Sequence, residues 1–73
     1  MNADTIATYA RAILAHIDAY EALRAGDAGL ASAAYAMREE ALDDIEGLTG
    51  RLRTDAFVSV ALMARDALAH RDA

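Results

Sequence analysis

The sequence predicts an all-α protein, and three observations carry this prediction. Proline is absent, and 20 of the 73 residues are alanine, which has the highest helix propensity. Apolar residues recur three and four positions apart along most of the chain, which places them on one side of a helix. Glycine is confined to residues 26–29 and 47–50, which divide the chain into helix-length segments. We therefore expect a single three-helix bundle, a helical hairpin plus a third helix, over residues 1–73.

The first helix is expected to begin at Asp4 or Thr5, either of which is a suitable N-cap, and to end at Ala25. Gly26 then suits the left-handed position that commonly follows a helix. Large apolar residues share one stripe that is predicted to face the core: Ile6, Tyr9, Ile13, Ile17 and Tyr20, with Ala10 among them. The opposite side of this helix is expected to carry Arg11, Asp18 and Ala22.

The second helix is expected from Ala28 to about Glu46, with Asp27 as its N-cap. Because the connection between the first two helices is short, they are predicted to form an antiparallel hairpin. The predicted core stripe of the second helix consists of Leu30, Ala34, Met37, Ala41, Ile45 and Leu48. Tyr35 and Leu42 lie well outside this stripe and form a second apolar strip, which favours a binding surface.

The third helix is expected to follow an N-cap at Thr54 or Asp55, with Thr49 as the alternative, and to end near His70. Its core side is predicted to carry Phe57, Val60, Ala61, Ala64, Ala67 and Leu68. Val58, Leu62 and Met63 widen this apolar surface around most of the helix, and such a helix needs contacts on more than one side. We therefore expect the bundle to be completed by homodimerisation, with Val58, Leu62 and Met63 as the self-association residues. A heterologous partner fits the same pattern, and a monomeric bundle with a few exposed apolar residues is the other alternative.

The chain carries twelve acidic residues against seven arginines and no lysine, a net charge of −5 that disfavours nucleic acid and anionic membranes. The acidic segment, residues 38–46, holds five carboxylates on a helix where like charges four positions apart repel each other. Three interpretations remain open: a solvated surface, a site for a hard cation, or a surface for a basic partner. The predicted partner-binding residues are Tyr35, Arg38, Glu39, Glu40, Leu42, Asp43, Asp44 and Glu46.

The sequence contains no pattern typical of an enzyme. It lacks cysteine, a glycine-rich phosphate loop and a nucleophile elbow. His16 is interpreted as a partly buried structural residue and His70 as a residue that stabilises a helix end. Neither histidine has the spacing of a metal site, so no metal, cofactor or catalytic residue is predicted. The absence of a signal peptide and of a run of about 20 apolar residues favours a cytoplasmic protein without membrane contact.

Together these features predict a small acidic, non-catalytic protein-binding module that acts as an adaptor, an inhibitor or an antitoxin-like neutraliser of a basic partner. Small size and negative charge are common among phage-encoded inhibitors and toxin-neutralising proteins. Two alternatives stay open. The first is a regulator that contacts DNA through Arg51, Arg53 and the third helix, and the second is a structural subunit of a larger assembly.

Overall fold

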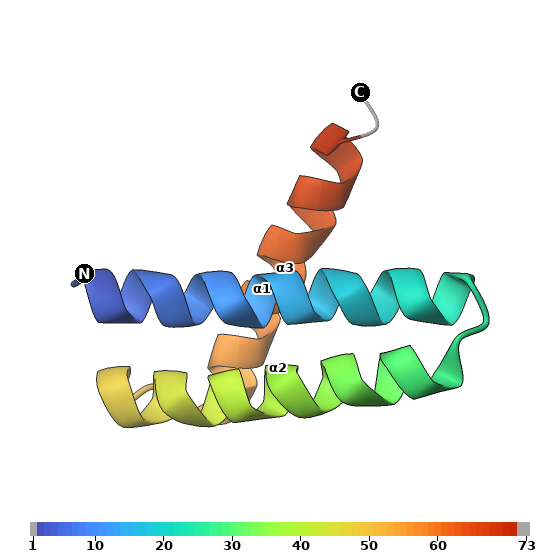
Figure 1. Ribbon diagram of the computed structural model, residues 1–73. Coiled ribbons are helices and arrows are strands. Elements are labelled where there is room, and N and C mark those ends of the chain that lie inside the picture. The colour runs from blue at the N-terminus through green and yellow to red at the C-terminus, as the bar shows by residue number, and fades with distance from the viewer. Residues whose placement is uncertain (1, 72–73) are drawn as a thin grey trace.

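A computed structural model describes residues 2–71, which form three α-helices: α1 (Ala3–Arg24), α2 (Ala28–Thr49) and α3 (Arg53–Arg71). The helices α1 and α2 lie side by side and antiparallel, and α3 crosses behind both so that its C-terminal half extends beyond α1 (Figure 1). The prediction of an all-α chain with three helices is confirmed. The predicted domain limits at residues 1 and 73 lie outside the described residues.

The N-cap residue of α1 differs from the predicted one, whereas that of α2 is the predicted residue. The side chain of Asn2 caps α1, and its Oδ1 accepts a hydrogen bond of 2.8 Å from the backbone N–H of Thr5. The predicted caps Asp4 and Thr5 are therefore wrong, and Asp4 instead lies in the first turn, where a carboxylate is favoured by the helix dipole. Asp27 caps α2 as predicted, because its Oδ1 accepts from the N–H of Leu30 at 3.0 Å.

The end of α2 lies three residues beyond the predicted one. The helix continues through Gly47 to Thr49 and stops at Gly50, whose φ of +73° is the left-handed conformation that favours glycine. The N–H of Gly50 donates to the carbonyl of Glu46 at 2.9 Å. The first turn of α3 then contains Thr54 and Asp55, so neither of these is the N-cap that the sequence predicts.

The core between α1 and α2 is built mainly from alanine. Nine of the thirteen buried apolar residues are alanines, and the hairpin contributes Ala12, Ala15, Ala19, Ala22, Ala31, Ala34 and Ala41. Small side chains on facing positions let two helix backbones approach closely. The larger core residues gather where α3 crosses the hairpin, and these are Tyr9, Leu42, Ile45 and Val60.

The predicted core stripe of α1 is confirmed in part, since Tyr9 lies in the core and Ile13 packs against it. Ile6 and Tyr20 are 55% and 43% exposed, whereas Ile13 and Ile17 are partly buried and Tyr9 is 7% exposed. Ala22, which the sequence places on the opposite side, is buried against α2. The prediction ranked positions by side-chain size, whereas α2 approaches along the alanine positions, where the least side-chain bulk separates the two backbones.

The other two helices follow the predicted pattern in part. The alanines of the α2 stripe and Ile45 are buried, but its largest members stay exposed, namely Leu30, Met37 and Leu48. Leu42, predicted as a partner-binding residue, is 1% exposed because α3 crosses α2 beside it, so its side chain belongs to the core. On α3, Val60 and Ala64 face the core as predicted, whereas Phe57 remains 37% exposed.

A membrane crossing requires a long, continuously apolar helix. Within residues 2–71 none of the helices meets that requirement.

Candidate protein-binding surfaces

Arg38 joins all three helices from a largely buried position in α2. Its guanidinium carbon lies 4.7 Å from the ring centroid of Tyr35 and 5.0 Å from that of Phe57. One guanidinium nitrogen donates to Nδ1 of His16 on α1 at 3.2 Å. Only 12% of the side chain is exposed, and its Nε is buried without a hydrogen-bond partner. The sequence predicts Arg38 as a partner-binding residue, but the structure gives it an internal packing role.

His16 lies in the same cluster and packs edge-on against Phe57, with ring centroids 6.0 Å apart. Burial of the imidazole, followed by the nearby positive charge of Arg38, lowers the pKa of His16 from its ordinary value. Arginine is a donor only, so the neutral imidazole accepts the Arg38 hydrogen bond at Nδ1 and carries its proton on Nε2. Protonation of His16 would place a second cation against Arg38.

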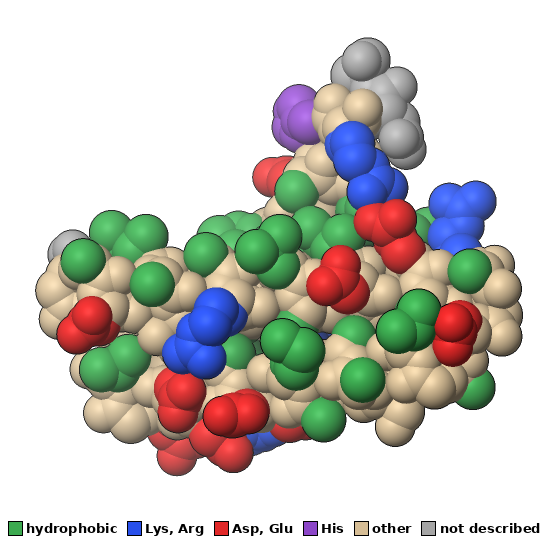
Figure 2. All heavy atoms as spheres, in the orientation of Figure 1, with side chains coloured by type: hydrophobic (Ala, Val, Ile, Leu, Met, Phe, Trp, Pro, Cys, Tyr) green, Lys and Arg blue, Asp and Glu red, His purple; other side chains and the backbone are tan. Residues whose placement is uncertain are grey.

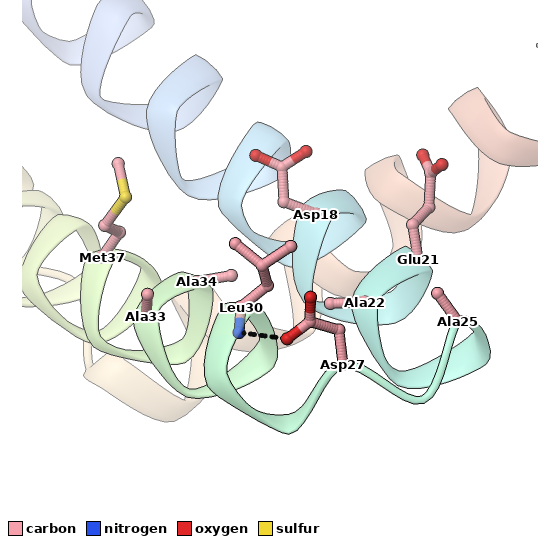
Figure 3. Close-up of a pocket in the computed structure, with 9 residues that line it drawn as sticks. All are labelled: Asp18, Glu21, Ala22, Ala25, Asp27, Leu30, Ala33, Ala34 and Met37. Atoms are coloured by element: carbon pink, nitrogen blue, oxygen red, sulfur yellow. Dashed lines mark hydrogen bonds between the residues drawn. The ribbon is translucent and has the colours of Figure 1, made fainter.

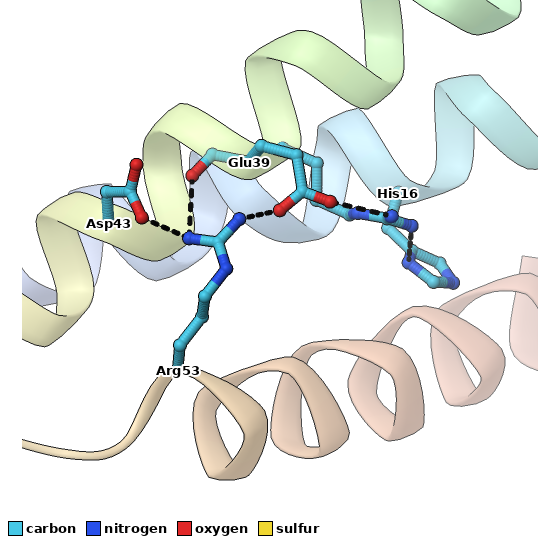
Figure 4. Close-up of polar contacts among 5 residues, drawn as sticks. His16, Glu39, Asp43 and Arg53 are labelled. Atoms are coloured by element: carbon cyan, nitrogen blue, oxygen red, sulfur yellow. Dashed lines mark hydrogen bonds and ion pairs between the residues drawn. The ribbon is translucent and has the colours of Figure 1, made fainter.

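The acidic segment is divided between two sides of α2 rather than forming one surface. Glu39 and Asp43 form ion pairs with Arg53 at the start of α3, and Arg53 also donates to the backbone carbonyl of Glu39 at 3.2 Å (Figure 4). Asp44 pairs with Arg11 of α1 at 3.3 Å. Three of the five carboxylates thus connect α2 to its neighbouring helices.

The remaining two carboxylates of the segment, Glu40 and Glu46, are exposed and form no ion pair among residues 2–71. Tyr35, the aromatic residue of the predicted surface, is 37% exposed but has one face covered by Arg38.

The two arginines proposed for DNA contact are also engaged within the chain. The guanidinium of Arg51 donates to the hydroxyl of Tyr9 at 2.6 Å and to the hydroxyl of Ser59 at 3.1 Å. Arg53 is held by Glu39 and Asp43. Both arginines attach the start of α3 to the hairpin, so a nucleic acid would have to compete with these internal contacts.

Several grooves with mainly apolar linings are formed by the described residues, and three of them lie between pairs of helices. The hairpin groove, of about 490 Å³, lies between α1 and α2 and is shown in Figure 3; its residues are Asp18, Glu21, Ala22, Ala25, Asp27, Leu30, Ala33, Ala34 and Met37. The crossing groove, of about 370 Å³, lies where α3 passes α1, and its residues are Ile6, Tyr9, Ala10, Ile13, Arg51, Ser59 and Met63. The third groove, of about 350 Å³ between α2 and α3, is lined by Glu39, Leu42, Arg53, Thr54, Phe57 and Val58.

The predicted self-association residues are all exposed. Met63 lies in the crossing groove and Val58 in the third groove, and Leu62 lines none of the three. Their exposed fractions are 42%, 54% and 48%. The sequence-based prediction missed Ile6 as a surface residue and also Leu30 and Met37, because it assigned all three to the core. The alanines at positions 12, 15, 19 and 22 were the available signal, since they form a continuous stripe of their own.

No group of three or more histidine and carboxylate side chains within residues 2–71 is arranged to hold a metal ion. Comparisons with protein-family models, with curated proteins and with solved structures found no match for this chain. The surfaces are therefore interpreted from their own contacts, burial and charge.

Proposed function

We propose that this chain is a non-catalytic protein-binding module that associates with a second copy of itself through the crossing groove. One observation supports this proposal above the others. Among the residues that the structure describes, nine alanines are buried in the core, but thirteen large apolar side chains are at least 37% exposed. Within residues 2–71, the large side chains that are less than 2% exposed are Leu42, Ile45 and Val60.

The unusual feature of this chain is the kind of side chain that is exposed. Its total accessible surface area is close to that of an ordinary monomer. The accessible surface is 4721 Å². A compact monomer of 7.8 kDa is expected to expose about 4,400 Å². The excess is small, so the shape is nearly that of an ordinary globular chain, but its surface carries the residues that normally fill a core. Large exposed apolar patches of this kind are typical of protein interfaces.

Charge makes the crossing groove the apolar surface best suited to a second copy. A two-fold contact brings the same patch of both copies together, so a patch with carboxylates would meet its own charge. The crossing groove contains no carboxylate among its described lining residues. Its single charged residue, Arg51, has its guanidinium hydrogen-bonded to Tyr9 and Ser59. Ile6, Ile13 and Met63 would then bury their apolar area against the partner copy.

The test is the mass in solution of three proteins: the natural chain, Met63→Ser and the matched variant Met37→Ser. Both methionines are exposed helix residues, but only Met63 lines the crossing groove. Size-exclusion chromatography with light scattering at tens of micromolar should give twice 7.8 kDa for the natural chain and for Met37→Ser. Met63→Ser should shift toward the monomer. A natural chain that remains monomeric in this range contradicts the proposal of self-association.

A further inference from the structure

We propose that the hairpin groove is a docking site for a basic amphipathic helix of another protein, which would lie between α1 and α2 on the side opposite α3. This inference rests on the proposed protein-binding function and names the class of partner. The groove is lined by residues of α1, α2 and the turn between them, without a described residue of α3. Figure 3 shows Leu30 and Met37 from α2 and Asp18 from α1 projecting on the same side of the hairpin.

The small residues at the bottom of the groove, and the two large apolar residues beside them, suit the apolar side of a helix. The floor of the groove is formed by small residues, including Ala22 and Ala34, and a helix can approach such positions closely. Leu30 and Met37 stand beside the floor and are each 63% exposed, the highest exposure among the large apolar residues of α2. Methionine adapts its shape readily and is frequent on surfaces that accommodate helices.

The length of the groove also suits a helix. The groove is lined by residues of the segments 18–25, at the end of α1, and 30–37 of α2, each of which corresponds to about 12 Å of helix. About two turns of a partner helix would fill this length, and the rest of an 18-residue helix would extend beyond it. Apolar anchors three and four positions apart on one side of that helix would reach the row formed by Leu30, Ala34 and Met37.

The negative charge around the groove indicates that a partner should be positively charged. Asp18, Glu21 and Asp27 border it, and no lining residue that the structure describes carries a positive charge. Glu21 is paired with Arg71 at 2.6 Å, which leaves Asp18 and Asp27 as the carboxylates without an ion pair among the described residues. Figure 2 shows acidic side chains beside hydrophobic ones across the side of the hairpin that is turned away from α3.

The same charges argue against a second copy as the occupant of this groove. In a two-fold contact the carboxylates of both copies would face each other, and each chain already carries a net charge of −5. A helix with lysine or arginine on both sides of its apolar strip would instead place cations beside Asp18 and Asp27. Such complementary charges increase the association rate and select the partner's orientation.

The probe for this inference is a synthetic 18-residue amphipathic helix of leucine and lysine, with a leucine and glutamate peptide of the same pattern as its control. Binding is measured by fluorescence anisotropy of the labelled peptide at low and high salt. The leucine–lysine peptide should bind, and its affinity should fall as salt screens the exposed charges. The glutamate peptide should not bind detectably. Equal binding of both peptides would contradict the role of charge.

Two matched pairs of variants locate the binding site. Met37→Ser should weaken binding of the basic peptide about tenfold, whereas Met63→Ser should leave it unchanged. Asp18→Lys should weaken it by about three- to tenfold at low salt, whereas Asp66→Lys, the same charge change at an exposed position of α3, should have no effect. Helix content from circular dichroism confirms that each variant folds. If Met63→Ser and Asp66→Lys weaken binding as much as their counterparts, the groove is not the site.

The outcomes separate this inference from the proposed self-association. A chain that dimerises but binds neither peptide overturns the inference and leaves the proposed function intact. If Met37→Ser abolishes dimerisation, the hairpin groove is covered by the second copy, and the inference is again overturned. Peptide binding by a strictly monomeric chain would support the groove and contradict the self-association.

Discussion

Replacing Arg38 by alanine is expected to loosen the contact between all three helices. The guanidinium stacks on Tyr35 of its own helix and on Phe57 of α3, and it donates to His16 of α1. With 12% of its side chain exposed, Arg38 also fills volume where α3 crosses the hairpin. Few other residues of this small core could compensate, because most of them are alanines.

The size of the effect follows from these contacts. Each of the two stacking contacts is worth about 1 kcal/mol at this burial, and the hydrogen bond to His16 about another 1 kcal/mol. Removing the buried, unpaired Nε recovers about 1 kcal/mol, while loss of the packed aliphatic stem costs about 1 kcal/mol. Arg38→Ala should therefore lower the free energy of unfolding by about 3 kcal/mol. Arg38→Met, which retains the stem, should lower it by about 2 kcal/mol.

The loss is large for this chain, since 73 residues correspond to a total stability of roughly 4–11 kcal/mol. The measurement is urea unfolding followed by circular dichroism, made in the Met63→Ser background so that association does not contribute to stability. Arg38→Ala should unfold at a clearly lower urea concentration, with Arg38→Met between it and the parent. If Arg38→Ala costs less than about 0.5 kcal/mol, as ordinary surface substitutions do, the packing role assigned to Arg38 is refuted.

Two further predictions concern pH and the alanine core. The pKa of His16 is lowered in the folded chain, so the unfolded chain binds a proton more readily, and the free energy of unfolding should decrease as the pH falls below about 6.5. His16→Gln should flatten this dependence in urea titrations between about pH 5 and 8; an unchanged slope would assign it to other groups. Ala12, at 0% exposure between α1 and its neighbours, should tolerate leucine poorly, with a loss of about 1–3 kcal/mol in thermal or urea unfolding. Ala7→Leu at an exposed position of α1 should change stability by less than about 0.5 kcal/mol, and equal effects of the two substitutions would contradict the close approach of the helices.

The pairing of the acidic segment with arginines depended on the crossing of α3. Residues 39 and 43 lie close to Arg53 in space but fourteen and ten residues from it along the chain. Their spacing on α2 was evident from the sequence, and it correctly predicted that they lie on adjacent turns. No local pattern indicates that the first residue of α3 returns to that side of α2, so the ion pairs of Glu39 and Asp43 with Arg53 were not predicted from the sequence.

The amino-acid sequence by itself determined the number of helices, the first turn with the cap at Asp27, and the approximate region of the second turn. These features are local, since they follow from alanine content, glycine positions and the hydrogen bonds of nearby side chains. The sequence did not determine which side of each helix is buried, because two overlapping stripes compete on α1 and each satisfies a helical period. In the tertiary structure the alanine stripe of α1 is the buried one, because it permits the closer approach of α1 to α2. That arrangement turned Ile6, Leu30 and Met37 outward, and it created the exposed apolar grooves from which a binding function is proposed.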